Sequence, residues 1–230
     1  MHAMMVALSA CAQHGQVSFE LVFPPGIDGL PAAVLSMRLT IDDPARVVEV
    51  PIEADGSFVL DVSLPADGGS TRVTLDALDA DRTVLVRGRS APLPLSGFSD
   101  AFVLFMATPG EFSLAPVAFV SARARRASVS LPYGVLYAGG EDESGSLGDE
   151  LVVYNVYTHE FQAGAALPQA RAGMAAAGAS GGLVYLFGGI GPTRTPVATT
   201  WRFDTNAPPG GTYTDVVDDP AYARAGAQMA

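Results

Sequence analysis

The stretch that decides the fold is Gly134-Val135-Leu136-Tyr137-Ala138-Gly139-Gly140, because it is written again as Leu183-Val184-Tyr185-Leu186-Phe187-Gly188-Gly189. Both copies are apolar runs that close on a glycine pair. A polar loop follows each pair, and then a second apolar run: Leu151-Val152-Val153-Tyr154-Asn155 in the first copy, Thr200-Trp201-Arg202-Phe203-Asp204 in the second. The two glycine pairs lie about 50 positions apart, a period that indicates a repeat architecture.

This repeated pattern resembles the kelch repeat, a four-stranded blade of a β-propeller. In that family the glycine pair ends the second strand, an aromatic residue lies on the third, and another aromatic follows on the fourth. Tyr154 and Phe161 fit those positions in the first copy. In the second copy Phe203 and Tyr213 fit them, with an insertion at 207–211 between the two. The resemblance covers 125–230 and implies about two blades.

Closed propellers typically have four to eight blades, so two blades imply an incomplete propeller. We therefore expect this sequence to be a piece of a longer protein. We also expect the outward side of the second blade to leave Val184 and Leu186 partly uncovered.

Small residues follow Leu167-Pro168-Gln169-Ala170 in the segment Arg171-Ala172-Gly173-Met174-Ala175-Ala176-Ala177-Gly178. Small side chains suit an innermost propeller strand, where blades converge. The alternative is an alanine-rich helix at 172–179, which its two glycines disfavour. Arg126 precedes the corresponding strand of the first copy, and we place it in the same position as Arg171 and Arg224.

The composition favours an all-β protein. The chain has 230 residues, with 25 glycines and 17 prolines, while charged residues make up only 16%. Abundant turn formers with few charges are typical of short strands joined by tight turns. The net charge is −11, which argues against nucleic acid as a partner.

Residues 1–11 read as a secretion signal that ends in Leu8-Ser9-Ala10-Cys11. This ending resembles a bacterial lipobox, in which the cysteine is lipidated and becomes the mature N-terminus. By the same resemblance, Ala12 after the cysteine implies retention in the outer membrane of the cell envelope. The alternative is an ordinary lone thiol. Cys11 is the only cysteine, so it has no partner in the chain for a disulfide.

After a short tether at 12–16, strands and turns alternate over 17–107. We expect strands at 17–23, 33–41, 46–52, 57–64, 71–77, 83–89 and 101–106. The strand at 57–64 alternates clearly, since its apolar residues at 58, 60, 62 and 64 would share one face. Several short strands over such a length indicate an immunoglobulin-like or transthyretin-like β-sandwich. The overall prediction is an all-β chain: an N-terminal β-sandwich followed by an incomplete kelch-type propeller.

The segment 108–124 reads as a linker between the two parts, and the arginines at its end are Arg123, Arg125 and Arg126. Such a cluster is a candidate phosphate-binding patch. We favour a solvated face or a set of salt bridges, because those are the commoner roles of surface arginines.

Residues that carry catalysis are scarce. His159 is the one histidine outside the signal and tether, and it falls in a tight turn where a polar residue is expected anyway. A nucleophilic triad has no other histidine to draw on, and one cysteine with scattered histidines makes no zinc site. The acidic loop Glu141–Glu150 is a candidate calcium loop, but its spacing matches no calcium motif. We therefore expect no catalytic residue, no bound metal and no cofactor.

The longest loops follow the glycine pairs, at 141–149 and 190–199. Loops on a rigid scaffold commonly carry recognition, and these two differ sharply in charge. We expect Asp142, Glu143 and Arg194 to be the polar contacts to a ligand, with drift in unconstrained loops as the alternative. The chain then reads as a cell-envelope binding module for a protein or a glycan. Two other readings remain: an extracellular carbohydrate-active enzyme with its catalytic residues in missing blades, and a structural envelope spacer.

The lipobox hypothesis predicts that expression in a bacterial host yields a chain that begins at a lipidated Cys11 and partitions with membranes. The Cys11→Ser variant should lose the lipid and the membrane partitioning, because the hydroxyl does not replace the thiol in that modification. Intact mass spectrometry of both proteins measures this. An unmodified N-terminus at Met1 in the parent protein would contradict the hypothesis.

Overall fold

The computed structural model describes residues 4–6, 19–60, 69–94, 102–119 and 121–228. Strands and connecting loops make up nearly all of this part of the chain, and its helices are two single 3₁₀ turns, η1 (Ser180–Gly182) and η2 (Pro220–Tyr222). The all-β prediction is therefore confirmed. The chain divides into one compact unit of Met1–Ala118 with Tyr157–His159, and a second of Phe119–Val156 with Glu160–Ala230.

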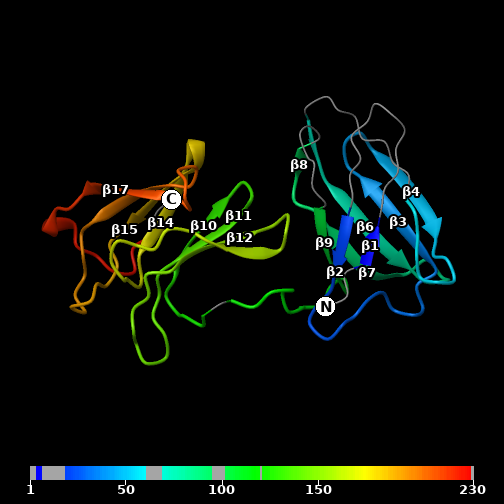
Figure 1. Cartoon of the computed structure of the whole chain (residues 1–230), viewed down its shortest axis with the longest axis horizontal. Helices are drawn as coiled ribbons and strands as arrows, with labels where there is room; N and C mark the ends of the chain where they lie inside the picture. The colour runs from blue at the N-terminus through cyan, green and yellow to red at the C-terminus, as the bar shows by residue number, and fades with distance from the viewer. Residues whose placement is uncertain (1–3, 7–18, 61–68, 95–101, 120, 229–230) are drawn as a thin grey trace. The chain divides into compact units, whose positions relative to one another are not determined.

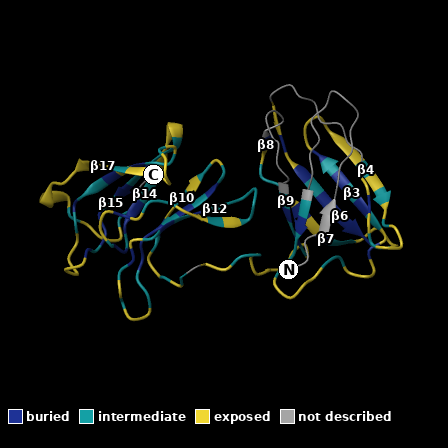
Figure 2. Cartoon of the chain, in the orientation of Figure 1, coloured by how far each residue is buried: buried dark blue, intermediate teal, exposed yellow. Residues whose placement is uncertain are grey.

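The first unit is built on a seven-stranded sheet of order β1-β2-β9-β7-β6-β3-β4 (Figure 1). Its strands are β1 (Met4–Val6), β2 (Phe19–Val22), β3 (Ser36–Ile41), β4 (Arg46–Pro51), β6 (Val73–Leu78), β7 (Val84–Arg89) and β9 (Phe102–Ala107). A second, two-stranded sheet pairs β5 (Ser70–Thr71) with β8 (Leu93–Pro94). Alternate residues of β3 are buried, as a sheet with one face on a core requires (Figure 2).

One predicted strand of this unit is wrong in its described part. Residues 57–60 form no strand, and 61–64 lie outside the described residues. Phe58 and Leu60 are nevertheless buried while Ser57 and Val59 are exposed. An extended segment alternates its side chains whether or not a neighbouring strand pairs with it, so the pattern indicated burial correctly and pairing incorrectly.

The second unit contains two four-stranded sheets in which consecutive strands pair antiparallel. The first sheet is β10 (Ala127–Leu131), β11 (Gly134–Ala138), β12 (Leu151–Asn155) and β13 (Glu160–Ala163). The second is β14 (Ala175–Ala179), β15 (Leu183–Phe187), β16 (Thr200–Asp204) and β17 (Thr212–Val217). Residues 175–178 of the small-residue segment thus lie in strand β14, and the helix alternative at 172–179 is wrong.

The two sheets repeat each other in register. Tyr137 lies opposite Val152 in the first, and Leu186 lies opposite Trp201 in the second. At the outer strands Tyr154 pairs with Phe161, and Phe203 pairs with Tyr213. The sequence repeat is therefore also a structural repeat.

One core joins the two sheets. The first sheet contributes Leu136, Ala138, Leu151 and Val153, and the second contributes Val184, Leu186, Trp201 and Phe203. Val184 and Leu186 are fully buried there, so the expectation that they lie partly uncovered on the outward side is wrong. Strand alternation predicts which residues share a face but not which of the two faces meets the neighbouring sheet.

The arginine that repeats before each inner strand is Arg123, and the expectation of Arg126 is wrong. Backbone hydrogen bonds show which residues are equivalent in the two repeats. Glu141 N donates to the carbonyl of Ala124, and Ile190 N donates to that of Ala172. Ala124 and Ala172 are thus equivalent. The residues before them, Arg123 and Arg171, are equivalent as well.

Arg171 shows what this position does between two packed sheets. Its guanidinium lies 3.8 Å from the ring centroid of Trp201, and it donates to the carbonyls of Gly188 and Thr199, both at 3.2 Å. Burial lowers the pKa of Arg171 to about 10, against the raising effect of Asp218 and Asp215. The side chain is therefore still charged at neutral pH.

The glycine pairs let the repeats approach closely. Gly139 and Gly188 both have positive φ, 64° and 65°. A side chain on Gly139 would overlap the carbonyl oxygen of Arg171, and one on Gly188 would overlap that of Arg224. Only glycine satisfies both the backbone conformation and the contact.

We predict that Gly139→Ala destabilises the second unit far more than Gly181→Ala. Gly181 has a similar φ of 74°, but no neighbouring atom lies within 4 Å of the place that a methyl group would take. Gly181→Ala therefore measures only the free-energy cost of holding alanine at a positive φ. That cost is about 1–2 kcal/mol. Gly139→Ala should add about 1–3 kcal/mol for the overlap with Arg171. Urea unfolding of both variants measures the difference, and equal losses would contradict the close packing.

Candidate functional site

The loops after the two glycine pairs fold in the same way. In the first, Asp142 N donates to the carbonyl of Ser146 at 3.1 Å and Gly145 N donates to that of Asp142 at 2.9 Å. In the second, Gly191 N donates to the carbonyl of Thr195 at 3.1 Å and Arg194 N to that of Gly191 at 2.9 Å. Equivalent turns therefore present different side chains from one edge of the repeated sheets.

Asp142 holds its own loop together. Its Oδ1 accepts from the Ser144 amide at 2.9 Å, the Ser144 hydroxyl at 2.6 Å and the Ser146 amide at 2.9 Å. These bonds, that of the Ser144 hydroxyl foremost, lower the pKa of the Asp142 carboxyl. Its second oxygen lies 4.0 Å from Nη1 of Arg123. The predicted ligand contact is thus already engaged in shaping the loop.

Arg194 joins the second loop to the first. Its Nη1 lies 3.1 Å from Oε2 of Glu141, and its Nη2 donates to the carbonyl of Gly145. Glu141 also accepts from Arg125 through Oε1 at 3.0 Å. The hydrogen bonds of Arg125 and then of Arg194 lower the pKa of Glu141, so this carboxylate stays ionised between two arginines.

Glu143 is the remaining predicted contact. It is exposed, and among the described residues no hydrogen bond or ion pair engages its carboxylate. Of the predicted set, Glu143 is thus the one whose side chain is available to a ligand without breaking a bond inside the protein.

A second charged cluster lies beside the first loop. Glu150 accepts from the Ser121 hydroxyl and from Nη2 of Arg126 at 3.1 Å, and Nε of Arg123 lies 3.7 Å away. The Ser121 bond, followed by that of Arg126, lowers the pKa of Glu150. Arg126 has only 9% of its side chain exposed, and its Nη1 is buried with no hydrogen-bond partner in the described part of the chain.

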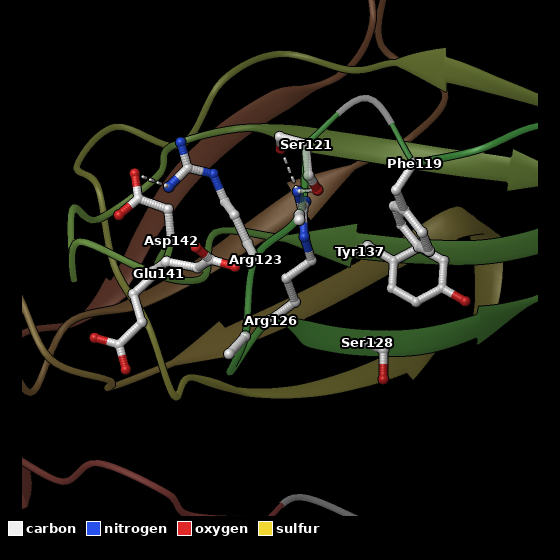
Figure 3. A pocket seen from close by; sticks show the side chains of 11 residues that line it. Phe119, Ser121, Arg123, Arg126, Ser128, Tyr137, Glu141 and Asp142 are labelled. Carbon is white, nitrogen blue, oxygen red and sulfur yellow. Dashed lines mark hydrogen bonds and ion pairs between the residues drawn. The ribbon is translucent and has the colours of Figure 1, made fainter.

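Ser121, Arg123 and Arg126 of this cluster line an open cleft of about 660 Å³ against the first sheet (Figure 3). Figure 3 shows the rings of Phe119 and Tyr137 on one side and Arg123 with Asp142 and Glu141 on the other. The two rings meet edge to face with centroids 4.9 Å apart. Glu143 also lines the cleft, whereas Arg194 does not.

The structure therefore separates the predicted residues. Arg194 contacts the loop that carries Asp142 and Glu143, but through Glu141 and Gly145, which were not among the predicted contacts. For the arginine cluster, the sequence analysis favoured a solvated face or salt bridges over a phosphate-binding patch. In the structure Arg123, Arg125 and Arg126 all form salt bridges with carboxylates. No sequence signal pointed to Phe119, which lies in the expected linker.

The remaining sequence-based candidates for catalysis, metal binding and membrane attachment lie outside this cleft. His159 occupies the turn between β12 and β13 with a φ of 53°, which a turn residue can adopt. Within the described ranges, no three histidine, cysteine or acidic side chains gather as metal ligands. The same ranges contain no helix with the length and apolar character needed to span a membrane. Cys11 lies outside the described residues.

Comparison with models of protein families and with the sequences of curated proteins gave no match for this chain.

We predict that Arg194→Gln raises the pKa of Glu141, because the ionised carboxylate loses one of its two cationic partners. Because the two arginines lower the pKa of Glu141, their pairing with the ionised carboxylate stabilises the fold at neutral pH. This stabilisation is lost as the pH falls through the pKa of Glu141 in the folded protein. Carbon-detected NMR titration of the Glu141 carboxyl measures the shift. Arg202→Gln, at an exposed arginine of β16, should leave the titration unchanged. An unchanged Glu141 in Arg194→Gln would show that the loops are not linked in solution.

Proposed function

We propose that this chain is a binding module of the bacterial cell envelope, in which the two sheets of the second unit are blades of a kelch-like propeller. The ligand is a protein or a glycan, and it binds across the loops after the glycine pairs. The observation that carries the proposal is the link of Arg194 to Glu141 and Gly145, which joins loops from consecutive repeats into one surface.

Such a surface suits recognition. The loops stand on paired strands, and their internal bonds and the link between them reduce the flexibility that a ligand would otherwise have to restrict. Glu143 is exposed on this surface, and none of the described residues pairs with its carboxylate. Charged and hydrogen-bonding groups held in fixed positions give specificity for polar partners, whether protein side chains or sugar hydroxyls.

The carboxylates favour binding over glycoside hydrolysis. A hydrolase of that kind needs one carboxylic acid with a raised pKa, ready to protonate the leaving oxygen. Around the cleft, hydrogen bonds lower the pKa of Glu141, Asp142 and Glu150 instead. The alternative of a carbohydrate-active enzyme therefore requires an acid other than these three carboxylates.

The propeller proposal draws its support from the repeat. Each sheet is a four-stranded antiparallel meander, and the two share register, glycine pairs and a common core. The seven-stranded sheet of the first unit, with its small companion sheet, fits a proposed sandwich of the immunoglobulin-like or transthyretin-like kind at 17–107. Residues 108–124 would then be the linker before the blades at 125–230.

The envelope location depends on the signal at 1–11. Strand β1 pairs with the edge of the seven-stranded sheet at β2, with Met4 opposite Leu21. Cleavage before Cys11 would remove β1 and leave β2 as the edge strand. The proposal of an outer-membrane anchor thus implies that the sheet is stable without β1.

We predict that Glu143→Ala weakens ligand binding at least tenfold, since a charge-assisted hydrogen bond to the ligand is worth about 1.5–3 kcal/mol. The purified chain is tested against an array of bacterial surface glycans and against immobilised envelope proteins, which separates the two ligand classes. Glu160→Ala, at an exposed acidic residue of β13, is the matched control. If Glu143→Ala and its control bind alike, the ligand does not use this surface.

A further inference from the structure

Two arginines of the second unit adopt a backbone conformation that the repeat elsewhere gives to glycine. Arg125 has a φ of 56°, whereas Gly173 and Gly226 have values of 65° and 70°. The three residues are equivalent, because each directly follows an Arg-Ala pair, at 123–124, 171–172 or 224–225. A side chain makes this conformation less stable than it is for glycine. The presence of arginine at 125 therefore needs a reason other than the backbone.

The second of these arginines is Arg194, which has a φ of 61°. The matching turns of the two long loops make Gly145 its equivalent, and Gly145 has a φ of 79°. Each arginine lies over the glycine that is its own equivalent in the other repeat. A Cβ added to Gly173 would come within 2.9 Å of Nη2 of Arg125, and one added to Gly145 would come within 2.9 Å of Nη2 of Arg194. Both side chains therefore cross from one repeat to the other.

The two guanidiniums converge on one carboxylate. Nη1 of Arg125 donates to Oε1 of Glu141 at 3.0 Å, and Nη1 of Arg194 donates to Oε2 at 3.1 Å. In the second repeat the equivalent of Glu141 is Ile190, which has no charge but makes the same backbone bond. We call Arg125, Glu141 and Arg194 the arginine cluster of the junction. The backbone of the repeat does not require this cluster, since the other copy forms without its side chains.

The arginine cluster of the junction carries an excess of positive charge. Two guanidiniums share the single carboxylate of Glu141, and their side chains are 41% and 52% exposed. Among the described residues their one other partner is the carbonyl of Gly145, which accepts from Nη2 of Arg194. Nε and Nη2 of Arg125 and Nε of Arg194 are thus available as donors. Guanidiniums with donors held in fixed positions suit an anionic group such as a carboxylate.

The surroundings of this cluster favour an acidic sugar over an acidic protein surface. Glu143 is exposed in the same loop, and the chain has a net charge of −11. An acidic protein surface brings several carboxylates at once, which these negative charges would repel. A uronic-acid glycan brings one carboxylate on each sugar ring, surrounded by hydroxyls that can donate to Glu143. The charges therefore match an acidic sugar more closely.

We propose that Arg125 and Arg194 bind the carboxylate of a uronic-acid sugar, while Glu141 holds the two guanidiniums in position. The inference rests on the proposed function, because it names the class of ligand that binds across the loops. All three residues lie at the junction between the two sheets of the second unit. The site therefore does not depend on what covers the outward face of either sheet.

Isothermal titration calorimetry tests the ligand class. The purified chain is titrated with oligosaccharides of galacturonic, glucuronic and mannuronic acid, each beside its methyl ester, which keeps the hydroxyls but removes the charge. We expect at least one acid to bind, and its ester to bind about tenfold more weakly or worse, because hydrogen bonds to charged groups contribute that much. If none of the acids binds, or if the ester binds as tightly as its acid, the inference is wrong.

Two glycine variants test the residues. Arg125→Gly and Arg194→Gly place the residue of the other repeat at each position, and each should weaken binding of the acid about tenfold or more. Neither should lower the midpoint of urea unfolding, because glycine is at ease at a positive φ. Arg82→Gly is the matched control in the first unit, since Arg82 has a φ of 63° and an ion pair of 2.6 Å with Glu49. It should leave binding unchanged.

Several results would overturn the inference. Binding of the acid that survives either glycine variant, or that is lost equally in Arg82→Gly, would show that the two arginines do not hold the carboxylate. A lower urea midpoint in both glycine variants would show that the arginines serve the fold instead. A glutamate-rich peptide that binds through both arginines in place of the acidic sugars would contradict the ligand class.

The failure of this inference is distinct from the failure of the proposed function. If a neutral glycan or an envelope protein binds through Glu143, and both glycine variants bind it as the parent chain does, the proposed function holds and the carboxylate site is wrong. If no glycan and no envelope protein binds the chain at all, the proposed function itself is contradicted.

Discussion

The contact on which the second unit depends is the hydrogen bond from each glycine pair to the segment that opens the next repeat. Gly140 N donates to the carbonyl of Arg171, and Gly189 N donates to that of Arg224, both at 2.8 Å. These bonds need the two backbones to approach more closely than any side chain would allow at Gly139 or Gly188. The glycine pairs therefore set how one sheet follows another.

That spacing determines the rest of the unit. It brings Leu136 and Ala138 against Val184 and Leu186, so that one apolar core serves two sheets. It also brings the two long loops to the same edge, where Arg194 reaches Glu141. The first sheet contributes Leu136 and Ala138 to this core, whereas the second contributes the residues equivalent to Val135 and Tyr137. The two faces of the pair that point away from the core therefore carry different residues.

The repeat was predictable because its signals are local. Glycine pairs, aromatics and alternating apolar residues recur at the same spacing, and the strands β10–β17 follow them. Other features depend on contacts between distant residues. Arg123, Arg125 and Arg126 are too close together for spacing alone to select the equivalent of Arg171, and backbone bonds decide it.

The candidate site was predictable only as a region. Length and charge drew attention to the two loops, and the structure places a cleft and two ion networks around the first of them. No local pattern marks Glu141 as the partner of Arg194, because the two come from different repeats. Asp142 does have a local pattern, but the pattern is ambiguous. An aspartate two residues before a serine can close a turn as well as bind a ligand, and in the structure Asp142 accepts from Ser144.

Native-state hydrogen exchange of the Gly140 and Gly189 amides tests the central claim most directly. Both residues are buried, and each amide donates across the junction between consecutive repeats. We expect them to exchange as slowly as the amides of the central strands β11 and β15, because opening either bond requires the sheets to separate. Exchange at the rate of exposed loop amides would contradict the account, since the repeats would then not be joined through their glycine pairs.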